Sequence, residues 1–161
     1  MKKSREIIPV FFTIDDDYAP LLGVALFSML KNASKVYQYK VFVLYKELSE
    51  LNREKLAGLA DKNCEMQFFE MKDELNTITD RMSNRLRADY FTLTIYFRLF
   101  IPVLFPEYDK GIYLDSDIVV PGDISELYQM HLGENLLGAV IDPVVAAVPE
   151  LTRHAELCVG V

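Results

Sequence analysis

The residues best suited to chemistry are two aspartates separated by a single residue. Asp115 and Asp117 flank Ser116 within residues 112–120, a run that is otherwise apolar. Residues two apart on extended backbone point to the same face, so both carboxylates could bind one hard divalent cation such as Mg²⁺ or Mn²⁺. Burying unpaired charge costs on the order of several kcal/mol, which a cation would offset. The pattern predicts a metal site, and its alternative is a solvated strand end with a helix-capping acid.

A second pair of aspartates, Asp15 and Asp17, has the same spacing and follows the apolar residues 7–14. Parallel sheets bind nucleotides where such a strand meets the next helix. No glycine-rich phosphate loop accompanies the pair, and carboxylates repel phosphate, so we expect these acids to contact donors of a base or a ribose. The alternative is an acidic helix start favoured by the helix dipole, with Asp17 as the expected N-cap.

A single arginine, Arg98, lies inside the nearly all-apolar residues 90–105. Its guanidinium needs an acidic partner there, which could be a diphosphate or one of the strand-end aspartates. Asp142 follows another short apolar run, residues 136–141, and could contact a substrate at the same sheet edge. A turn begun with Pro143 is the alternative for Asp142.

The elements that must position these residues are strands that alternate with helices. Such alternation predicts right-handed crossovers, a largely parallel sheet in one α/β domain, and ligands at the carboxyl ends of the strands. The expected strands are residues 7–14, 39–45, 65–71, 111–120 and 136–141. The expected helices are residues 18–31, 50–60 with Ser49 as N-cap, and a buried helix over 90–105, while residues 72–89 are expected to form a loop or short helices over the site.

Composition restricts the partners and the compartment. The net charge of -7 argues against nucleic acid, because phosphate binding needs clustered Lys and Arg. The cysteines, Cys64 and Cys158, show no metal-ligand spacing and fit core thiols of a reducing compartment, and His131 and His154 are expected at the surface. No apolar run reaches the roughly 20 residues of a transmembrane helix, so a cytoplasmic protein is expected.

Three ordered motifs carry a family resemblance. Residues 12–18 (Phe-Thr-Ile-Asp-Asp-Asp-Tyr), 96–99 (Tyr-Phe-Arg-Leu) and 113–120 (Tyr-Leu-Asp-Ser-Asp-Ile-Val-Val) together resemble the family 8 glycosyltransferases over residues 8–142. The resemblance implies a Rossmann-like fold of the GT-A type. It also implies Mn²⁺-dependent transfer of glucose or galactose, with retention, from a UDP-hexose to a saccharide or lipid-linked saccharide acceptor.

The resemblance also implies roles for particular residues. Asp115 and Asp117 would hold the metal against the diphosphate, Thr13 and Asp15 would contact the uracil, and Asp17 the ribose. The metal would act as a Lewis acid on the departing UDP. Double displacement and same-face attack both remain open as routes to retention.

Three further residues complete the implied site. Arg98 would lie near the phosphate or sugar of the donor, and Ser116 would bind the nucleotide. Asp142 would lie near the transferred sugar or the acceptor, and Arg98 and Asp142 together are the expected catalytic residues.

Some later segments of the family have no counterpart in this sequence. Family members continue with further strands, an Asn-Ala-Gly-type segment and a histidine that completes the metal site. We therefore expect residues 1–161 to be the nucleotide-sugar-binding part of one glycosyltransferase domain, incomplete at its C-terminus and weak or inactive alone. The longer protein could be peripheral to the membrane, and a homodimer is one possible assembly.

Two other functions stay open. Residues 112–119 also resemble the Asp-x-Asp-x-Val signature of haloacid-dehalogenase-like phosphatases, with Asp115 as nucleophile, although that family needs a later Lys and none follows Asp117. A non-catalytic nucleotide-binding or receiver module would use residues 15–17 around Mg²⁺. Dephosphorylation that depends on Asp115, or uptake of phosphate from a small phosphodonor, would distinguish these functions.

Overall fold

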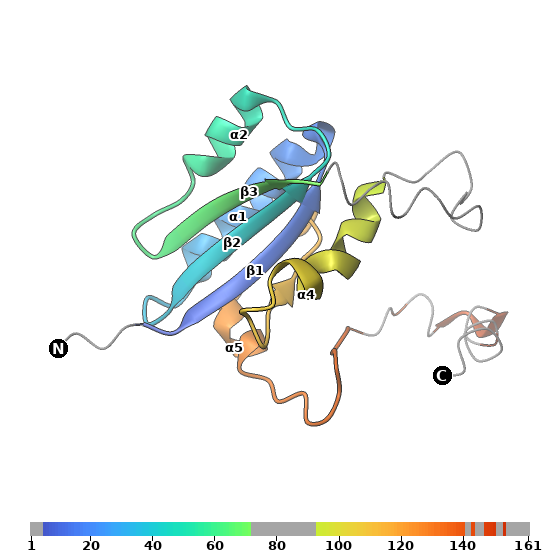
Figure 1. Ribbon diagram of the computed structural model, residues 1–161. Coiled ribbons are helices and arrows are strands. Elements are labelled where there is room, and N and C mark those ends of the chain that lie inside the picture. The colour runs from blue at the N-terminus through green and yellow to red at the C-terminus, as the bar shows by residue number, and fades with distance from the viewer. Residues whose placement is uncertain (1–4, 72–92, 141–142, 144–146, 151–152, 154–161) are drawn as a thin grey trace. The chain divides into compact units, whose positions relative to one another are not determined.

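A four-stranded sheet forms the core of the computed structural model, which describes residues 5–71, 93–140, 143, 147–150 and 153 (Figure 1). The strands are β1 (Ile7–Ile14), β2 (Gln38–Tyr45), β3 (Cys64–Glu70) and β4 (Ile112–Tyr113). They are all parallel, in the order β3-β2-β1-β4. The predicted α/β class and the first three predicted strands are confirmed, each strand within one residue.

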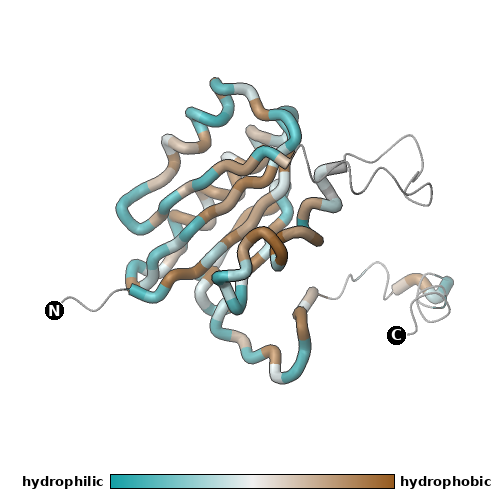
Figure 2. Tube along the Cα trace, viewed as in Figure 1, coloured by the Kyte–Doolittle hydropathy of each residue, from teal (hydrophilic) through white to brown (hydrophobic). Residues whose placement is uncertain are grey.

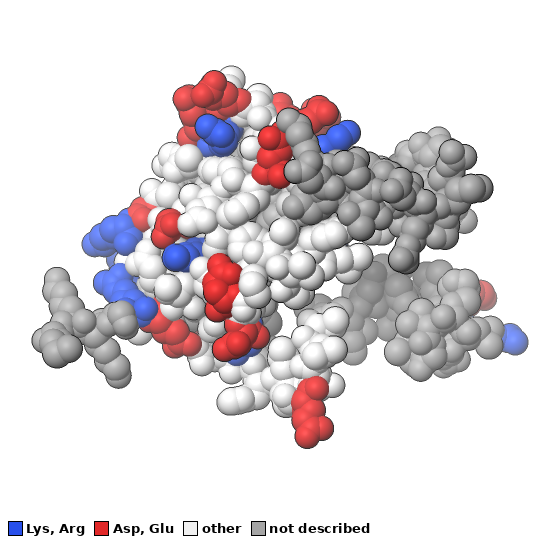
Figure 3. All heavy atoms as spheres, viewed as in Figure 1, with Lys and Arg blue, Asp and Glu red and all other residues white. Residues whose placement is uncertain are grey.

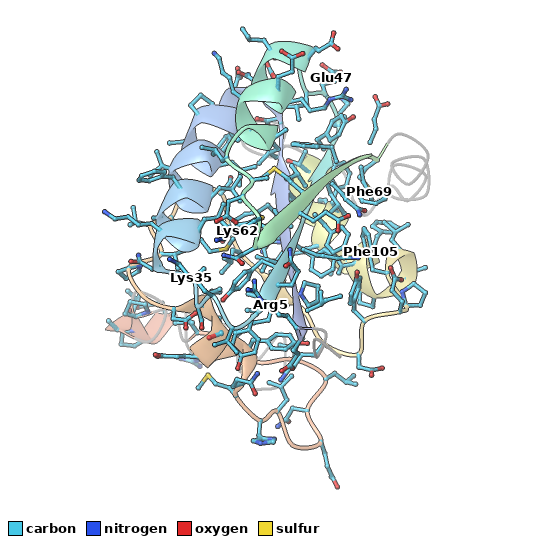
Figure 4. The ribbon with its side chains drawn as sticks, turned by 90° about the vertical axis from the view of Figure 1, so that its left-hand side faces the viewer. Arg5, Lys35, Glu47, Lys62, Phe69 and Phe105 are labelled. Carbon is cyan, nitrogen blue, oxygen red and sulfur yellow. The ribbon has the colours of Figure 1, made fainter. Side chains whose placement is uncertain are left out.

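Helices cover both faces of this sheet. Helices α1 (Ala19–Asn32) and α2 (Glu50–Ala57) lie on one side, whereas η3 (Leu93–Phe100) and α4 (Ile101–Leu104) lie on the other (Figures 1 and 4). Residues 8–14 of β1 are buried throughout, because alternate residues face the two layers. β1 is accordingly mainly hydrophobic along its length, and most of α2 is hydrophilic (Figure 2).

The side-chain core has two parts, one on each face of the sheet. The larger cluster, under α1, includes Ile8, Val10, Phe12, Ile14, Leu22, Leu26, Met29, Tyr39, Val41 and Val43. The smaller cluster, under η3 and α4, contains Phe11, Phe42, Leu44, Met71, Phe97 and Phe105. Phe105 contacts Phe69 on that side with ring centroids 5.0 Å apart (Figure 4). The central strands β1 and β2 are therefore held between two apolar layers, whereas most of β3 is only partly buried or exposed.

The start of the first helix differs from the prediction. Asp15, rather than Asp17, is the N-cap, and it precedes a short 3-10 helix, η1 (Asp16–Tyr18), that leads into α1. Ser49 caps α2 as predicted, with its hydroxyl accepting from the Asn52 N–H at 3.3 Å. That helix ends at Ala57, three residues before the predicted end at residue 60.

The prediction of a single buried helix over residues 90–105 is also wrong. η3 and α4 divide the segment, because Pro102 lacks an N–H and fits the first turn of a new helix. Phe97 is fully buried, but Leu99 and Val103 are 68% and 75% exposed. The sheet covers only one side of this segment, so its apolar composition overstated its burial.

The strand that was predicted over residues 111–120 is much shorter in the structure. β4 pairs with β1 at Ile112 and Tyr113, and one further bond runs from the Leu114 N–H to the Phe11 carbonyl at 3.0 Å. The chain then turns at Ser116 and Asp117. A short helix that was not predicted, α5 (Ile124–Tyr128), follows with Asp123 as its N-cap, and five residues are too few to show a clear periodicity.

A second compact unit, Met130–Val161, follows the sheet-containing unit Met1–Gln129. The strand predicted over residues 136–141 is absent over the described residues 136–140, where Leu136 and Val140 are 99% and 92% exposed. A strand needs a partner for its backbone groups, and none of the described residues pairs with these. Asp142, His154, Cys158 and residues 72–89 lie outside the described residues, and His131 is exposed as predicted.

Cys64 is a buried free thiol, as predicted for a core cysteine. Burial raises the pKa of Cys64 to about 12, so its thiol stays protonated and unreactive at neutral pH. No described helix combines the length and the apolar composition that a bilayer crossing requires.

Candidate nucleotide and metal site

The two acidic motifs follow neighbouring strands at one edge of the sheet. Val10 pairs with Ile112 and Phe11 with Tyr113, so Thr13 and Asp115 each lie two residues beyond the last paired position. Parallel strands end on the same side, and the loops that begin at Asp15 and Asp115 are therefore neighbours. This is the edge at which sheets of this type bind ligands.

A chain of hydrogen bonds joins the two loops through Tyr113. The Tyr113 hydroxyl lies 2.9 Å from Thr13 Oγ1 and 3.1 Å from Asp115 Oδ1. A carboxylate only accepts, so the tyrosine proton goes to Asp115 and Thr13 donates to Tyr113. Burial raises the pKa of Tyr113, which keeps this hydroxyl neutral and able to donate. Tyr113 was not predicted from sequence to belong to the site, although a residue two before Asp115 on a strand lies on the same side.

Arg98 reaches the same carboxylate from η3. Its Nη2 donates to Asp115 Oδ1 at 3.3 Å, and its guanidinium carbon lies 4.4 Å from the centroid of the Tyr113 ring. The side chains of Arg98 and Asp115 are 39% and 58% exposed. Asp115 is thus a partner of Arg98, which is one of the two alternatives that the sequence left open for this guanidinium. Ion pairs exposed to this degree contribute at most about 1 kcal/mol, so other ions can exchange into this one.

Asp115 and Asp117 are not the buried pair that the sequence predicted. Both are exposed, and Asp117 lies in the turn after β4 rather than on the strand. Ser116 between them is buried. The predicted penalty for buried charge therefore does not arise, because the strand ends before these acids.

The donor set of these two residues still fits a hard cation. Over the described part of the chain, no group of three or more His, Cys, Asp and Glu side chains is arranged to hold a metal ion. Mg²⁺ and Mn²⁺ can bind through one or two carboxylates, with water and phosphate oxygens as the other ligands. Asp115 and Asp117 would supply such carboxylates to a cation that arrives with a diphosphate.

The acids after β1 have different partners. Asp15 Oδ1 accepts from the Tyr18 N–H at 3.2 Å. Asp16 Oδ1 accepts from the Ser49 N–H at 2.7 Å and from Asn52 Nδ2 at 3.0 Å, and these bonds lower the pKa of Asp16. Asp16 therefore joins the start of α2 to the segment that follows β1. Sequence reasoning missed this role because the partners are 33 and 36 residues away.

Several basic side chains lie at the opposite end of the sheet from the site, whereas Lys46 and Arg98 lie at the carboxyl end. Arg5, Lys35 and Lys62 precede β1, β2 and β3 in sequence, and Glu47 lies at the carboxyl end (Figure 4). Lys and Arg atoms accordingly gather near the strand beginnings in the space-filling view (Figure 3). An anion at the carboxyl edge would meet Asp15, Asp115 and Asp117 as well as Arg98, so a cation that offsets these carboxylates would favour its binding.

These features define a Rossmann-like sheet with a candidate ligand site where the strand order reverses, between β1 and β4. Residues 9–157 match the model of glycosyl transferase family 8, and the chain belongs to that family. The match includes the segment on which the phosphatase resemblance rested, and it favours the transferase.

Relatives of known name support the same fold. Lipopolysaccharide 1,2-glucosyltransferase of Escherichia coli is 30% identical over 139 residues, which are 85% of this chain and 38% of that protein. The apo structure of the bifunctional glycosyltransferase WbbM is 34% identical with a TM-score of 0.72, covering 87% of this chain and 24% of that one. Galactosyltransferase LgtC, solved with donor and acceptor sugar analogues, is 29% identical with a TM-score of 0.68, covering 86% and 48%. The fold is of the GT-A type, and the chain spans at most about half the length of these three relatives.

Proposed function

We propose that this chain is the nucleotide-sugar-binding part of a retaining hexosyltransferase. It would use Mn²⁺ or Mg²⁺ to move glucose or galactose from a UDP-sugar to a saccharide acceptor. The supporting observation is that the two Asp-x-Asp loops lie at one sheet edge and are joined by Thr13, Tyr113 and Asp115, with Arg98 beside them. The relatives whose names include a glucosyltransferase and a galactosyltransferase support the hexose.

The charges at this edge assign opposite ends of the nucleotide to the two loops. A diphosphate would be repelled by Asp15 and by Asp115 unless a divalent cation lay between them. Asp115 and Asp117 would hold that cation. Arg98, released from Asp115, would supply a planar donor to the phosphates.

The base would lie at the end of β1. Because the Thr13 hydroxyl donates its proton to Tyr113, it can only accept a hydrogen bond from a ligand. The Asp15 carboxylate can likewise only accept. Both therefore suit an N–H donor of uracil, which offers one between two carbonyls. Asp17, exposed in η1, would accept from the ribose hydroxyls. Ser116 stays a proposed nucleotide contact, although it is buried between the two acids.

Transfer requires stabilisation of negative charge on the departing UDP. When bound, the cation supplies Lewis-acid stabilisation of that charge. Arg98 would add a positive charge at the same phosphates, and the exposed carboxylates of Asp115 and Asp117 would hold the cation at the edge of the sheet. Asp142 remains the candidate for the sugar or acceptor contact, and it lies outside the described residues.

Titration of UDP into the 161-residue chain with and without Mn²⁺ tests the proposal. We expect binding that depends on the metal, and we expect Asp117→Ala to weaken it by about tenfold or more. Asp109→Ala is the matched control, because Asp109 is an exposed acid before β4 and should leave UDP affinity unchanged. UDP binding that is equal with and without Mn²⁺, or equal in Asp117→Ala and wild type, would overturn the proposal.

A further inference from the structure

We propose that Tyr113 is a positioning residue that orients Asp115 for a divalent cation. The inference rests on the proposed function, because it concerns the same metal site. It assigns to Tyr113 a role that acts through Asp115 rather than through contact with a substrate.

The two oxygens of the Asp115 carboxylate are used unequally. Tyr113 donates to Oδ1 at 3.1 Å, and Arg98 donates to the same oxygen at 3.3 Å. Within the described residues, no hydrogen bond to Oδ2 occurs. The carboxylate is thereby held through one oxygen, and the other is left to bind a cation.

Tyr113 is the more rigid of the two donors. It lies on β4 opposite Phe11, its ring packs against the smaller core cluster, and its hydroxyl is fixed by Thr13 at 2.9 Å. Arg98 is partly exposed and reaches Asp115 through a long, flexible side chain. If Arg98 moves to a diphosphate, the tyrosine hydroxyl remains and keeps the carboxylate oriented.

Held in this way, the carboxylate loses little rotational freedom when a cation binds. Without the Tyr113 hydroxyl, the Asp115 carboxylate could rotate. Only the hydrogen bond from Arg98 would then hold one of its two oxygens. Removal of the hydroxyl should therefore weaken cation binding without changing the number of acids.

The test compares Tyr113→Phe with Tyr39→Phe. Tyr39 is also a buried tyrosine whose hydroxyl lies near an aspartate, at 3.4 Å from Asp123 Oδ1, but it lies away from the site. Electron paramagnetic resonance of free Mn²⁺ would measure metal affinity in the presence of UDP. We expect Tyr113→Phe to weaken it about tenfold, a usual effect of losing a hydrogen bond to a metal ligand, and Tyr39→Phe to match wild type.

The outcomes separate this inference from the proposed function. Wild-type affinity in Tyr113→Phe, together with loss of binding in Asp115→Ala, overturns the positioning role and leaves the metal site intact. Absence of UDP-dependent Mn²⁺ binding in wild type overturns both.

A second pair of variants applies if Tyr113→Phe does not fold. Thr13→Val removes the donor that fixes the Tyr113 hydroxyl, and Thr13→Ser restores one. We expect a severalfold loss of affinity for Mn²⁺ alone in Thr13→Val and recovery in Thr13→Ser. Equal affinities in these two variants overturn the role.

Discussion

Asp115 is the residue on which several interactions converge. Its Oδ1 accepts from both Tyr113 and Arg98, and in the proposed function its carboxylate also binds a cation. A guanidinium at Oδ1 and a divalent ion at Oδ2 would repel each other, so binding of the ion favours displacement of Arg98. Because the pair is exposed, its small stability contribution makes such an exchange feasible.

Arg98→Gln should separate metal binding from nucleotide binding. Loss of the competing guanidinium should tighten the binding of Mn²⁺ alone, and loss of a phosphate donor should weaken UDP binding in the presence of Mn²⁺, by about tenfold. The free energy of unfolding should change by less than about 1 kcal/mol. Calorimetric titrations of metal and of UDP measure the two effects, and a change of the same sign in both would contradict this exchange.

At the scale of elements, β4 must lie close to β1 to place Asp115. A Cβ atom on Gly111 would lie 2.6 Å from Phe11 Cε2. That ring cannot move easily, because it is 2% exposed and packs on Phe42 and Phe105 with centroids 4.9 and 5.0 Å away. Glycine at this position therefore allows the strand to approach.

Gly111→Ala should lower the free energy of unfolding by about 1–3 kcal/mol, as expected for overpacking. Gly122→Ala is the matched control, since nothing lies within 4 Å of its added Cβ, and its stability should match wild type. Urea denaturation followed by circular dichroism compares them. Equal denaturation midpoints for the two variants would show that the Phe11 ring moves aside without loss of stability.

Asp123 is the N-cap that ties α5 to the rest of the unit. Burial would raise its pKa, but bonds from Ser125, Ser34 and Tyr39 outweigh burial and lower it. A carboxyl with a lowered folded pKa stabilises the fold above its ordinary pKa of about 3.9, and this contribution is lost as the pH falls through the lowered value.

Asp123→Ala should therefore be less stable than wild type by about 1 kcal/mol near neutral pH, the usual effect of losing an N-cap. The difference should shrink as the pH falls below about 4. Thermal unfolding across this range measures it, with Asp123→Asn as a variant that keeps a capping oxygen without the charge. A difference that stays constant down to acid pH would argue against a role for the ionised carboxylate.

For the whole molecule, we expect the 161-residue chain to bind UDP-sugar weakly and to transfer poorly. Among the described residues only Asp115 and Asp117 serve the proposed cation, and two carboxylates hold Mn²⁺ less tightly than a fuller ligand set. A chain extended to the length of the relatives should bind Mn²⁺ and UDP more tightly and turn over faster. Equal turnover by the two chains, in an assay of sugar transfer to a saccharide acceptor, would contradict this expectation.

The sequence by itself determined the parallel α/β sheet, its first three strands and the positions of the acidic motifs. Apolar runs and helical spacing are local patterns, and a buried strand such as β1 shows its burial in its own composition. The family also followed from sequence, because three ordered motifs are far more specific than one Asp-x-Asp.

The tertiary structure decided which side chains meet. Thr13 and Tyr113 are 100 residues apart, and Arg98 and Asp115 are 17 apart, so their contacts depend on strand register and on where η3 packs. The shortness of β4 and the bonds from Asp16 to α2 likewise depend on neighbours that no local pattern records. Hydrogen bonds and ion pairs act only over a few ångströms, so their partners are defined only when the fold has brought distant segments together.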